Sequence, residues 1–292
     1  MKKNFYYLSL MLGLVFGMTM FTACGGGDDG DDPVPVPPTP QPEYGEFQGP
    51  KRVFGDNLLS SFGEENNSNW YLTYNSDGFV TKIKRESFFN NQLEAVREYE
   101  VSYTDKQVTV SRKRSGSERV KEFVITIGAN GFAESCTEGY TDSDKKNVST
   151  YEYDSDGHLT KITMTEDDKN PFGGIFTWQN GNIIEEKDFA HMDRPYNYTY
   201  TNVGNVAGLQ IVAQMGGDMD DLYLPELFYM GLLGKSTANL VQSYSYSNGS
   251  ESKTGENAWT LDAVGRPTKC VTTTTYPSDG HSYTRTCFWN YK

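Results

Sequence analysis

The chain has 292 residues, a formal net charge of −13 and an aromatic content of 14%. This length is sufficient for one sizeable β domain with its own core. The acidity argues against nucleic acid as a partner, because phosphate groups repel a negatively charged surface. The abundance of tyrosine and threonine favours strands, because these side chains suit a half-buried pleated surface.

The N-terminus has the three parts of an export signal. Lys2 and Lys3 form a short positive region, residues 5–20 are uncharged and mostly apolar, and small residues then lead to Cys24. A membrane span needs about 20 apolar residues, and this run is shorter. The pattern resembles a lipobox, although Phe21 replaces the usual leucine, whereas a transmembrane anchor does not explain the placed cysteine. We therefore expect residues 1–23 to be a lipoprotein signal peptide and Cys24 to be lipidated.

Residues 24–50 comprise this cysteine and an acidic, proline-rich segment. Such a composition cannot bury enough apolar surface to fold, so we expect a disordered tether. The proline half should be extended, at roughly 3 Å per residue. The early acids resemble the surface-export signal of Bacteroidetes lipoproteins, and a plain solvated spacer explains them equally well. We expect an outer-membrane location, anchored by lipid and exposed at the cell surface.

Residues 51–292 contain a repeated pattern. Two apolar or aromatic residues stand two positions apart, a polar turn residue and a glycine follow, and another apolar residue comes five positions later, as in 72–83 and 151–162. The copies centre on Gly78, Gly131, Gly157, Gly181, Gly204, Gly249 and Gly265. Asp-Gly and Asn-Gly supply the positive φ angles of tight turns, and apolar positions two apart share one face of a strand. Each copy therefore predicts a β-hairpin with one apolar face.

The hairpin geometry also predicts which residues face each other. A two-residue turn at Asp77-Gly78 places Leu72 opposite Ile83, and the same rule pairs Tyr151 with Ile162. A degenerate copy around 99–106 and a last turn at 277–280 extend the pattern, and the region as a whole predicts about eight hairpins. We predict an all-β fold in which an antiparallel up-and-down meander closes into a barrel-like or strongly curved sheet.

One segment lacks the β pattern. Acids precede it, Gly234 and Lys235 follow it, and Pro225 suits a first helical turn. We predict one short helix near 222–233. Apolar residues nearly encircle this helix, which indicates burial as a plug in the barrel or a cover over its end. We interpret the preceding acids Asp218, Asp220 and Asp221 as a solvated helix start.

The hairpins resemble two known groups of proteins. The unit Tyr151-Glu-Tyr-Asp-Ser-Asp-Gly-His-Leu-Thr-Lys-Ile162 is similar to the tyrosine–aspartate repeats of Rhs-type proteins. The whole arrangement, with its lipobox, its spacer and units such as Tyr74-Asn-Ser-Asp-Gly78, resembles a Bacteroidetes lipoprotein family of unknown function with a porin-like β fold. This resemblance spans roughly 51–292 and implies fold and location. It carries over no functional residues.

Motifs for catalysis or metal binding are weak. Asp154-x-Asp156-Gly157 begins like a calcium loop but lacks the later ligands, and His158 follows the turn glycine without a second histidine nearby. Gly234-Lys235-Ser236-Thr237 copies the end of a phosphate-binding loop, but Tyr229 stands where that motif needs glycine. We predict no metal, no cofactor and no catalytic site, so the protein is not expected to be an enzyme. A carboxylate pair of the glycosidase kind stays open.

The three cysteines of the hairpin region are expected to be core residues first. Cys136 and Cys270 occupy the apolar position of the repeat. Cys270 and Cys287 flank the last turn. A four-residue loop at 277–280 places them opposite each other, whereas a two-residue turn at Asp279-Gly280 does not. A disulfide between Cys270 and Cys287 is the alternative to two free thiols, because export permits oxidation.

The expected function follows from location and fold alone. We predict a cell-surface lipoprotein that acts as a non-enzymatic binding module for glycan or protein, held to the membrane by its lipid and without nucleic acid as partner. The four tryptophans could stack on sugar rings, although strand positions favour core packing. The alternative is a scaffold subunit of an envelope assembly without a small ligand. A membrane-spanning β-barrel ranks lower, because strands carry charges such as Lys82 and Lys84.

Overall fold

The computed structural model describes residues 47, 49–166, 171–189, 195–210, 225–247 and 252–292. Every described residue belongs to the compact unit Pro42–Lys292. The predicted signal peptide, Cys24 and the acids at 218–221 therefore lie outside the described residues. Among the described residues, no helix is both long enough and apolar enough to cross a membrane.

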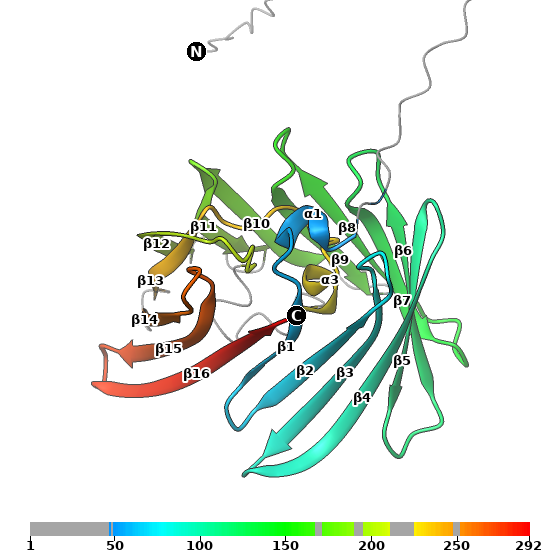
Figure 1. The fold of residues 1–292 in the computed structure, drawn as a ribbon, viewed down its shortest axis with the longest axis horizontal. Helices are drawn as coiled ribbons and strands as arrows, with labels where there is room; N and C mark the ends of the chain where they lie inside the picture. Colours follow the sequence, from blue (N-terminus) through cyan, green and yellow to red (C-terminus); the bar gives the residue numbers. More distant parts are fainter. Residues whose placement is uncertain (1–46, 48, 167–170, 190–194, 211–224, 248–251) are drawn as a thin grey trace, which may run out of the picture. The chain divides into compact units, whose positions relative to one another are not determined.

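The described residues form sixteen antiparallel strands that close into a barrel (Figure 1). Each strand pairs with its neighbours in sequence, and the first pairs with the last. This confirms the predicted all-β meander and its closure. The strands are β1 (Leu59–Glu64), β2 (Ser68–Tyr74), β3 (Val80–Phe89), β4 (Gln92–Tyr103), β5 (Gln107–Arg114), β6 (Val120–Ile127), β7 (Ala133–Tyr140), β8 (Asn147–Tyr153), β9 (Leu159–Glu166), β10 (Phe172–Gln179), β11 (Asn182–Asp188), β12 (Tyr196–Gly204), β13 (Asn239–Ser247), β14 (Ser252–Leu261), β15 (Pro267–Tyr276) and β16 (His281–Tyr291). Within the described ranges, two short helices accompany the strands, α1 (Lys51–Phe54) and α3 (Pro225–Tyr229).

The predicted register is confirmed, but the predicted turn is wrong. Leu72 lies opposite Ile83, and Tyr151 opposite Ile162. The β2–β3 connection is nevertheless wider than a two-residue turn, because the Asn75 side-chain oxygen accepts the backbone N–H groups of both Asp77 and Phe79. A register shift next to Thr73 compensates for the wider loop. The asparagine before the Asp-Gly pair therefore shapes the turn as much as the glycine does.

The turns alternate between the two ends of the barrel. The polar end carries the turns at 65–67, 90–91, 115–119 and 277–280, and the plugged end carries those at 75–79, 128–132, 154–158 and 262–266. Since α3 belongs to the connection between β12 and β13, it enters the barrel from the plugged end.

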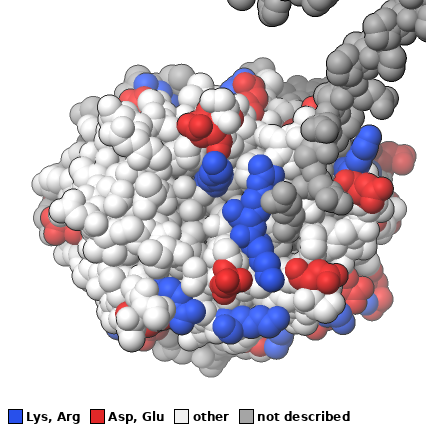
Figure 2. All heavy atoms as spheres, turned by 45° about the horizontal axis from the view of Figure 1, so that its top comes forward, with Lys and Arg blue, Asp and Glu red and all other residues white. Residues whose placement is uncertain are grey.

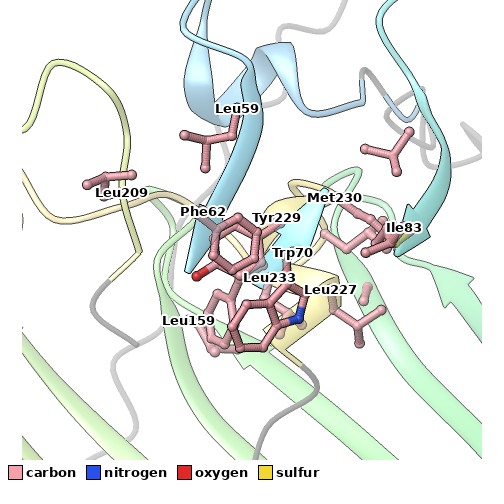
Figure 3. Close-up of a cluster of buried hydrophobic side chains, with 14 of the residues drawn as sticks. Leu59, Phe62, Trp70, Ile83, Leu159, Leu209, Leu227, Tyr229, Met230 and Leu233 are labelled. Atoms are coloured by element: carbon pink, nitrogen blue, oxygen red, sulfur yellow. The ribbon is translucent and has the colours of Figure 1, made fainter. Parts of the chain in front are cut away.

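The segment around α3 fills the plugged half of the barrel. A sixteen-stranded barrel encloses more space than strand side chains can fill. The Tyr229 ring stacks on Phe62 of β1 with 3.6 Å between centroids, and Leu227, Met230 and Leu233 are almost completely buried (Figure 3). The plug that the sequence offered as one of two alternatives is therefore the observed one.

The predicted helix at 222–233 is too long at its C-terminal end. The helix α3 ends at Tyr229, and residues 222–224 lie outside the described residues. Gly231 and Gly234 adopt φ angles of +72° and +84°, which a right-handed helix does not contain. The apolar residues between them are buried as a loop. Burial of this segment and a short helix within it were therefore predicted correctly, whereas the extension of the helix beyond Tyr229 was wrong.

The outer wall of the barrel is hydrophilic. Residues that alternate with the buried ones on β3, β4 and β5 include Lys82, Lys84, Glu98, Glu100 and Lys113, all of them exposed. Figure 2 shows side chains of both charges on the face that it presents. On these three strands, the positions that alternate with the buried core residues thus carry charged side chains that face solvent.

Candidate functional site

The calcium-like motif forms a small cluster at the plugged end. One ligand atom from each of Asp154, Asp156 and His158 lies within 4.8 Å of the others. The Asp154 carboxylate accepts the backbone N–H groups of Asp156 and His158, and its second oxygen lies 2.9 Å from His158 Nδ1. The imidazole also stacks on Trp178, with 4.3 Å between centroids. The Asp154 carboxylate and the His158 ring are therefore already engaged with each other and with the turn.

The equivalent turns show that this arrangement is structural. Asn75 makes the same two backbone contacts through an amide. In the β14–β15 turn, Asp262 makes them again, and Arg266 Nε takes the place of the imidazole at 2.7 Å. An amide or a guanidinium fulfils these roles without a metal. We therefore interpret the cluster as a turn-forming device.

The substitution Asp154→Ala should lower the free energy of unfolding by about 1–2 kcal/mol, because two backbone donors lose their acceptor. Asp154→Asn should cost less, since Asn75 fulfils the same role. Urea unfolding measures both, with Ser155→Ala as a neighbouring control. Calcium or zinc should leave the midpoint unchanged. A midpoint that rises with added metal would contradict the structural interpretation.

The phosphate-loop fragment also serves the fold. The backbone N–H of Lys235 donates to Gly157, and the Thr237 hydroxyl donates to the carbonyl oxygen of Asn239. The four tryptophans are likewise core residues. Trp70 and Trp289 are buried, while Trp178 and Trp259 donate their indole N–H groups to backbone carbonyls inside the barrel wall.

The cysteines face the interior. Burial raises the pKa of the Cys136 and Cys270 thiols to about 12, so neither is a ready nucleophile at neutral pH. Cys270 lies directly opposite Cys287, as the four-residue loop requires, and both are free thiols in the structure. The disulfide between them stays a prediction. Mass spectrometry of the full chain without reductant checks it through the loss of two hydrogens.

The polar end carries a group of cations that the sequence motifs did not predict. Arg85, Arg97 and Arg114 lie directly opposite one another on β3, β4 and β5. Next to them, Arg112 of β5 lies opposite Lys121 of β6. All five continue the inward-facing alternation of the core, as Arg112 does two residues after the buried Val110. The barrel interior therefore changes from apolar at the plugged end to strongly basic on this part of its wall.

Four of these five cations, all except Arg85, line a hollow of about 550 Å³, here called the arginine hollow. Its walls are Arg97, Arg112, Arg114, Arg119, Lys121, Tyr140 and the turn residues Ser115, Gly116 and Ser117. Two of the cations are neutralised at the edge. Arg119 forms a two-pronged pair with Asp142 at 3.0 Å, and Lys121 lies 2.9 Å from Glu138.

The other three cations of the hollow have no such partner. Within the described part of the chain, Arg97, Arg112 and Arg114 form no ion pair; Arg97 donates to the Ser87 hydroxyl, and Arg112 lies over the Phe123 ring. Burial, followed by the charges of Arg85, Arg112 and Arg114, lowers the pKa of Arg97. The three arginines thus concentrate positive charge in the hollow that no ion pair among the described residues neutralises.

A second hollow of about 490 Å³ lies at the same end, at the β15–β16 turn. It is lined by Tyr276, Ser278, Asp279, His281 and Tyr283. The Tyr276 ring lies 6.3 Å from His281 and 6.2 Å from Tyr283, measured between centroids. This second hollow, here called the tyrosine hollow, combines ring faces with a carboxylate and a hydroxyl.

Comparison with known proteins identifies the family. Residues 72–269 match the family described as "Domain of unknown function (DUF4595) with porin-like fold". The chain belongs to the DUF4595 family. The predicted resemblance to a family of unknown function with a porin-like fold is thereby confirmed, whereas the likeness to Rhs-type repeats stays a prediction.

Solved structures agree with the DUF4595 assignment. A porin-like protein from Bacteroides uniformis matches with a TM-score of 0.64 and 19% identity, covering 80% of this chain and 98% of its own. A porin-like protein from Bacteroides vulgatus matches with a TM-score of 0.51 and 14% identity, covering 80% and 99%. At these identities the likeness concerns the fold. No curated protein matches the chain.

Proposed function

We propose that this DUF4595 protein is a lipid-anchored, non-enzymatic binding module of the cell envelope that holds a glycan at the polar end of its barrel. The tyrosine hollow is the observation that carries the proposal. Its rings offer flat apolar faces, and Asp279 and Ser278 offer hydrogen-bonding groups beside them. Pockets that recognise small ligands combine apolar walls with a few such polar groups.

The filled interior supports binding rather than conduction. Porins of sixteen strands leave an aqueous channel. Here Phe62, Tyr229 and Met230 pack at the plugged end, and the Ala133 N–H of β7 donates to the carbonyl of Leu232 in the loop after α3. The described part of the barrel is therefore a cup with a packed base, and its polar end is the side available to a ligand.

The outer wall supports anchoring by a lipid rather than by the barrel itself. A membrane barrel needs an apolar band about 25 Å tall on its outer face. The side chains of Lys82 and Glu100 on this wall are 67% and 77% exposed, and in lipid such charges are costly. An exterior of this kind suits water next to a membrane, with the acidic and proline-rich tether spanning the distance to Cys24.

The substitution Cys24→Ala tests the anchor. In phase separation with a non-ionic detergent, the full chain expressed with its own leader should enter the detergent phase. The variant, expressed behind a leader that is cleaved without lipidation in place of residues 1–23, should enter the aqueous phase. Protease treatment of intact cells then reports surface exposure. If the variant still enters the detergent phase, the barrel itself inserts into lipid and the proposed anchoring is wrong.

A glycan array of the full chain, kept in a polyoxyethylene detergent without sugar groups, tests the binding role. We expect reproducible binding to a set of saccharides and a loss of roughly 10-fold or more in affinity for Tyr283→Ala, because a stacked ring contributes about 1–3 kcal/mol. Tyr71→Ala, on the outer wall and 41% exposed, is the matched control and should change nothing. A blank array on folded protein would contradict the glycan role and favour the scaffold alternative, which crosslinking on intact cells would then examine.

A further inference from the structure

We infer that the arginine hollow is an anion subsite that makes this protein select acidic saccharides, those that carry carboxylate or sulfate groups. The inference rests on the proposed glycan-binding function and names its ligand class. It starts from Arg97, Arg112 and Arg114, which line the hollow and form no ion pair among the described residues.

The arrangement of these arginines is unfavourable for the empty protein. Like charges directly opposite each other on neighbouring strands destabilise a sheet. Here Arg97 lies between Arg85 on one side and Arg114 on the other. On the same three strands, the inward-facing positions nearer the plugged end hold Ile83, Tyr99 and Val110, which are buried and carry no charges that repel each other. A local loss of stability of this kind is typical of a binding site whose ligand supplies the balancing negative charge.

The chemistry of the hollow suits a carboxylate or sulfate group. A guanidinium group presents its donors in a planar fork that matches two oxygens of an oxyanion. Three such forks, those of Arg97, Arg112 and Arg114, line one hollow. Its volume of about 550 Å³ lies within the range of small-ligand pockets, so it can take a sugar residue together with its charged substituent.

The surroundings disfavour a long polyanion. The Glu118 side chain is fully exposed on the turn that borders the hollow, and Asp142 stands beside Arg119. The chain as a whole carries a net charge of −13. A nucleic acid or another extended polyanion is repelled by these acids, whereas a saccharide with one or two acidic groups brings its charge only to the arginines.

The test compares two oligosaccharides of the same backbone, one neutral and one carrying uronic acid or sulfate, by calorimetry on the full chain. The native protein should bind the acidic form at least 10-fold more tightly, and added salt should reduce this preference. The double variant Arg112→Gln/Arg114→Gln should lose roughly 10- to 100-fold in affinity for the acidic form and keep its affinity for the neutral one. Lys82→Gln/Lys113→Gln removes the same charge from the outer wall and should bind as the native protein does.

Each outcome decides a different claim. If both oligosaccharides bind equally and Tyr283→Ala weakens both, the glycan role stands and the anion subsite is wrong. If neither binds, both proposals fail. If inorganic sulfate competes at the same concentration as a sulfated sugar, the hollow is a simple anion site and saccharide selection is refuted. Should the double variant fail to fold, Arg114→Lys keeps the charge but loses the fork, and an unchanged affinity for the acidic form overturns the inference.

Discussion

Replacing Phe62 with alanine should lower the free energy of unfolding by about 3–5 kcal/mol. The ring is 4% exposed and stacks on Trp70 at 4.9 Å and on Tyr229 at 3.6 Å, measured between centroids. It therefore joins the closing strand β1 to its neighbour β2 and to the plug. Its removal leaves a cavity that the closed barrel cannot collapse to fill.

Urea unfolding of the full chain measures this effect. The control is Phe89→Ala, which deletes the same ring where it is 68% exposed, and it should change the free energy by less than about 0.5 kcal/mol. Equal midpoints for the two variants would show that α3 does not pack inside the barrel. The description of the barrel as a cup with a packed base would then fail.

Removing the charge of Arg285, which pairs with Glu64, should lower the free energy of unfolding by roughly 2–3 kcal/mol. This is somewhat less than the effect of removing one partner from a fully buried ion pair. Its Nε lies 2.8 Å from Glu64, and the side chains are only 14% and 16% exposed. The two residues come from β16 and β1, the strands whose pairing closes the barrel. The substitution Arg285→Gln leaves the Glu64 carboxylate partly desolvated and without its nearest cation.

A double-mutant cycle with Glu64→Gln isolates the pair itself. We expect a coupling energy of about 1–3 kcal/mol between the two positions. The exposed pair Glu152–Lys161, at 2.6 Å on the outer wall, should couple by less than about 1 kcal/mol. A coupling for Glu64 and Arg285 no larger than that of the exposed pair would indicate that β1 and β16 do not meet as described.

Local pattern was sufficient to predict most of the wall. The two-residue alternation of Tyr151 and Tyr153, a turn at Gly157 and the apolar Ile162 determine a hairpin and its register, because a one-residue slip moves every buried side chain to the water side. That register was confirmed. It also places Glu152 opposite Lys161, and the two side chains form an ion pair on the outer wall. The sequence predicted a closed or strongly curved sheet but not the pairing of β1 with β16, because neither strand carries a feature that specifies its partner.

Features set by distant contacts were missed or predicted incorrectly. The apolar run that contains Leu227 and Leu233 predicts burial whatever its secondary structure, and both residues are buried. Helix propensity alone predicts that the helix continues through this run, but the positive φ angle of Gly231 ends it. The β2–β3 turn is wider than predicted because the Asn75 side chain accepts hydrogen bonds from two backbone N–H groups of the turn. A prediction based on the Asp-Gly pair alone does not include this side chain.

The candidate site was the least predictable part. Arg97 and Arg112 occupy core-facing positions two residues from Tyr99 and Val110, so the alternation already carried a signal. A charged residue at a strand end is usually solvated, however, and only the pairing of β3, β4 and β5 shows that the arginines gather. The tyrosine hollow likewise depends on the four-residue loop at 277–280, one of two turns that the sequence left open.

Photocrosslinking tests most directly whether the polar end is the binding site. The full chain is mixed with an acidic oligosaccharide that carries a diazirine, irradiated and digested, and the labelled residues are found by mass spectrometry. We predict labels on inward-facing residues of the polar end, at the Arg112–Lys121 and Tyr276–Tyr283 segments, with loss of labelling when unlabelled sugar is added. Labels confined to the outer wall or to the turns of the plugged end would contradict the proposal that the barrel is a glycan-binding cup.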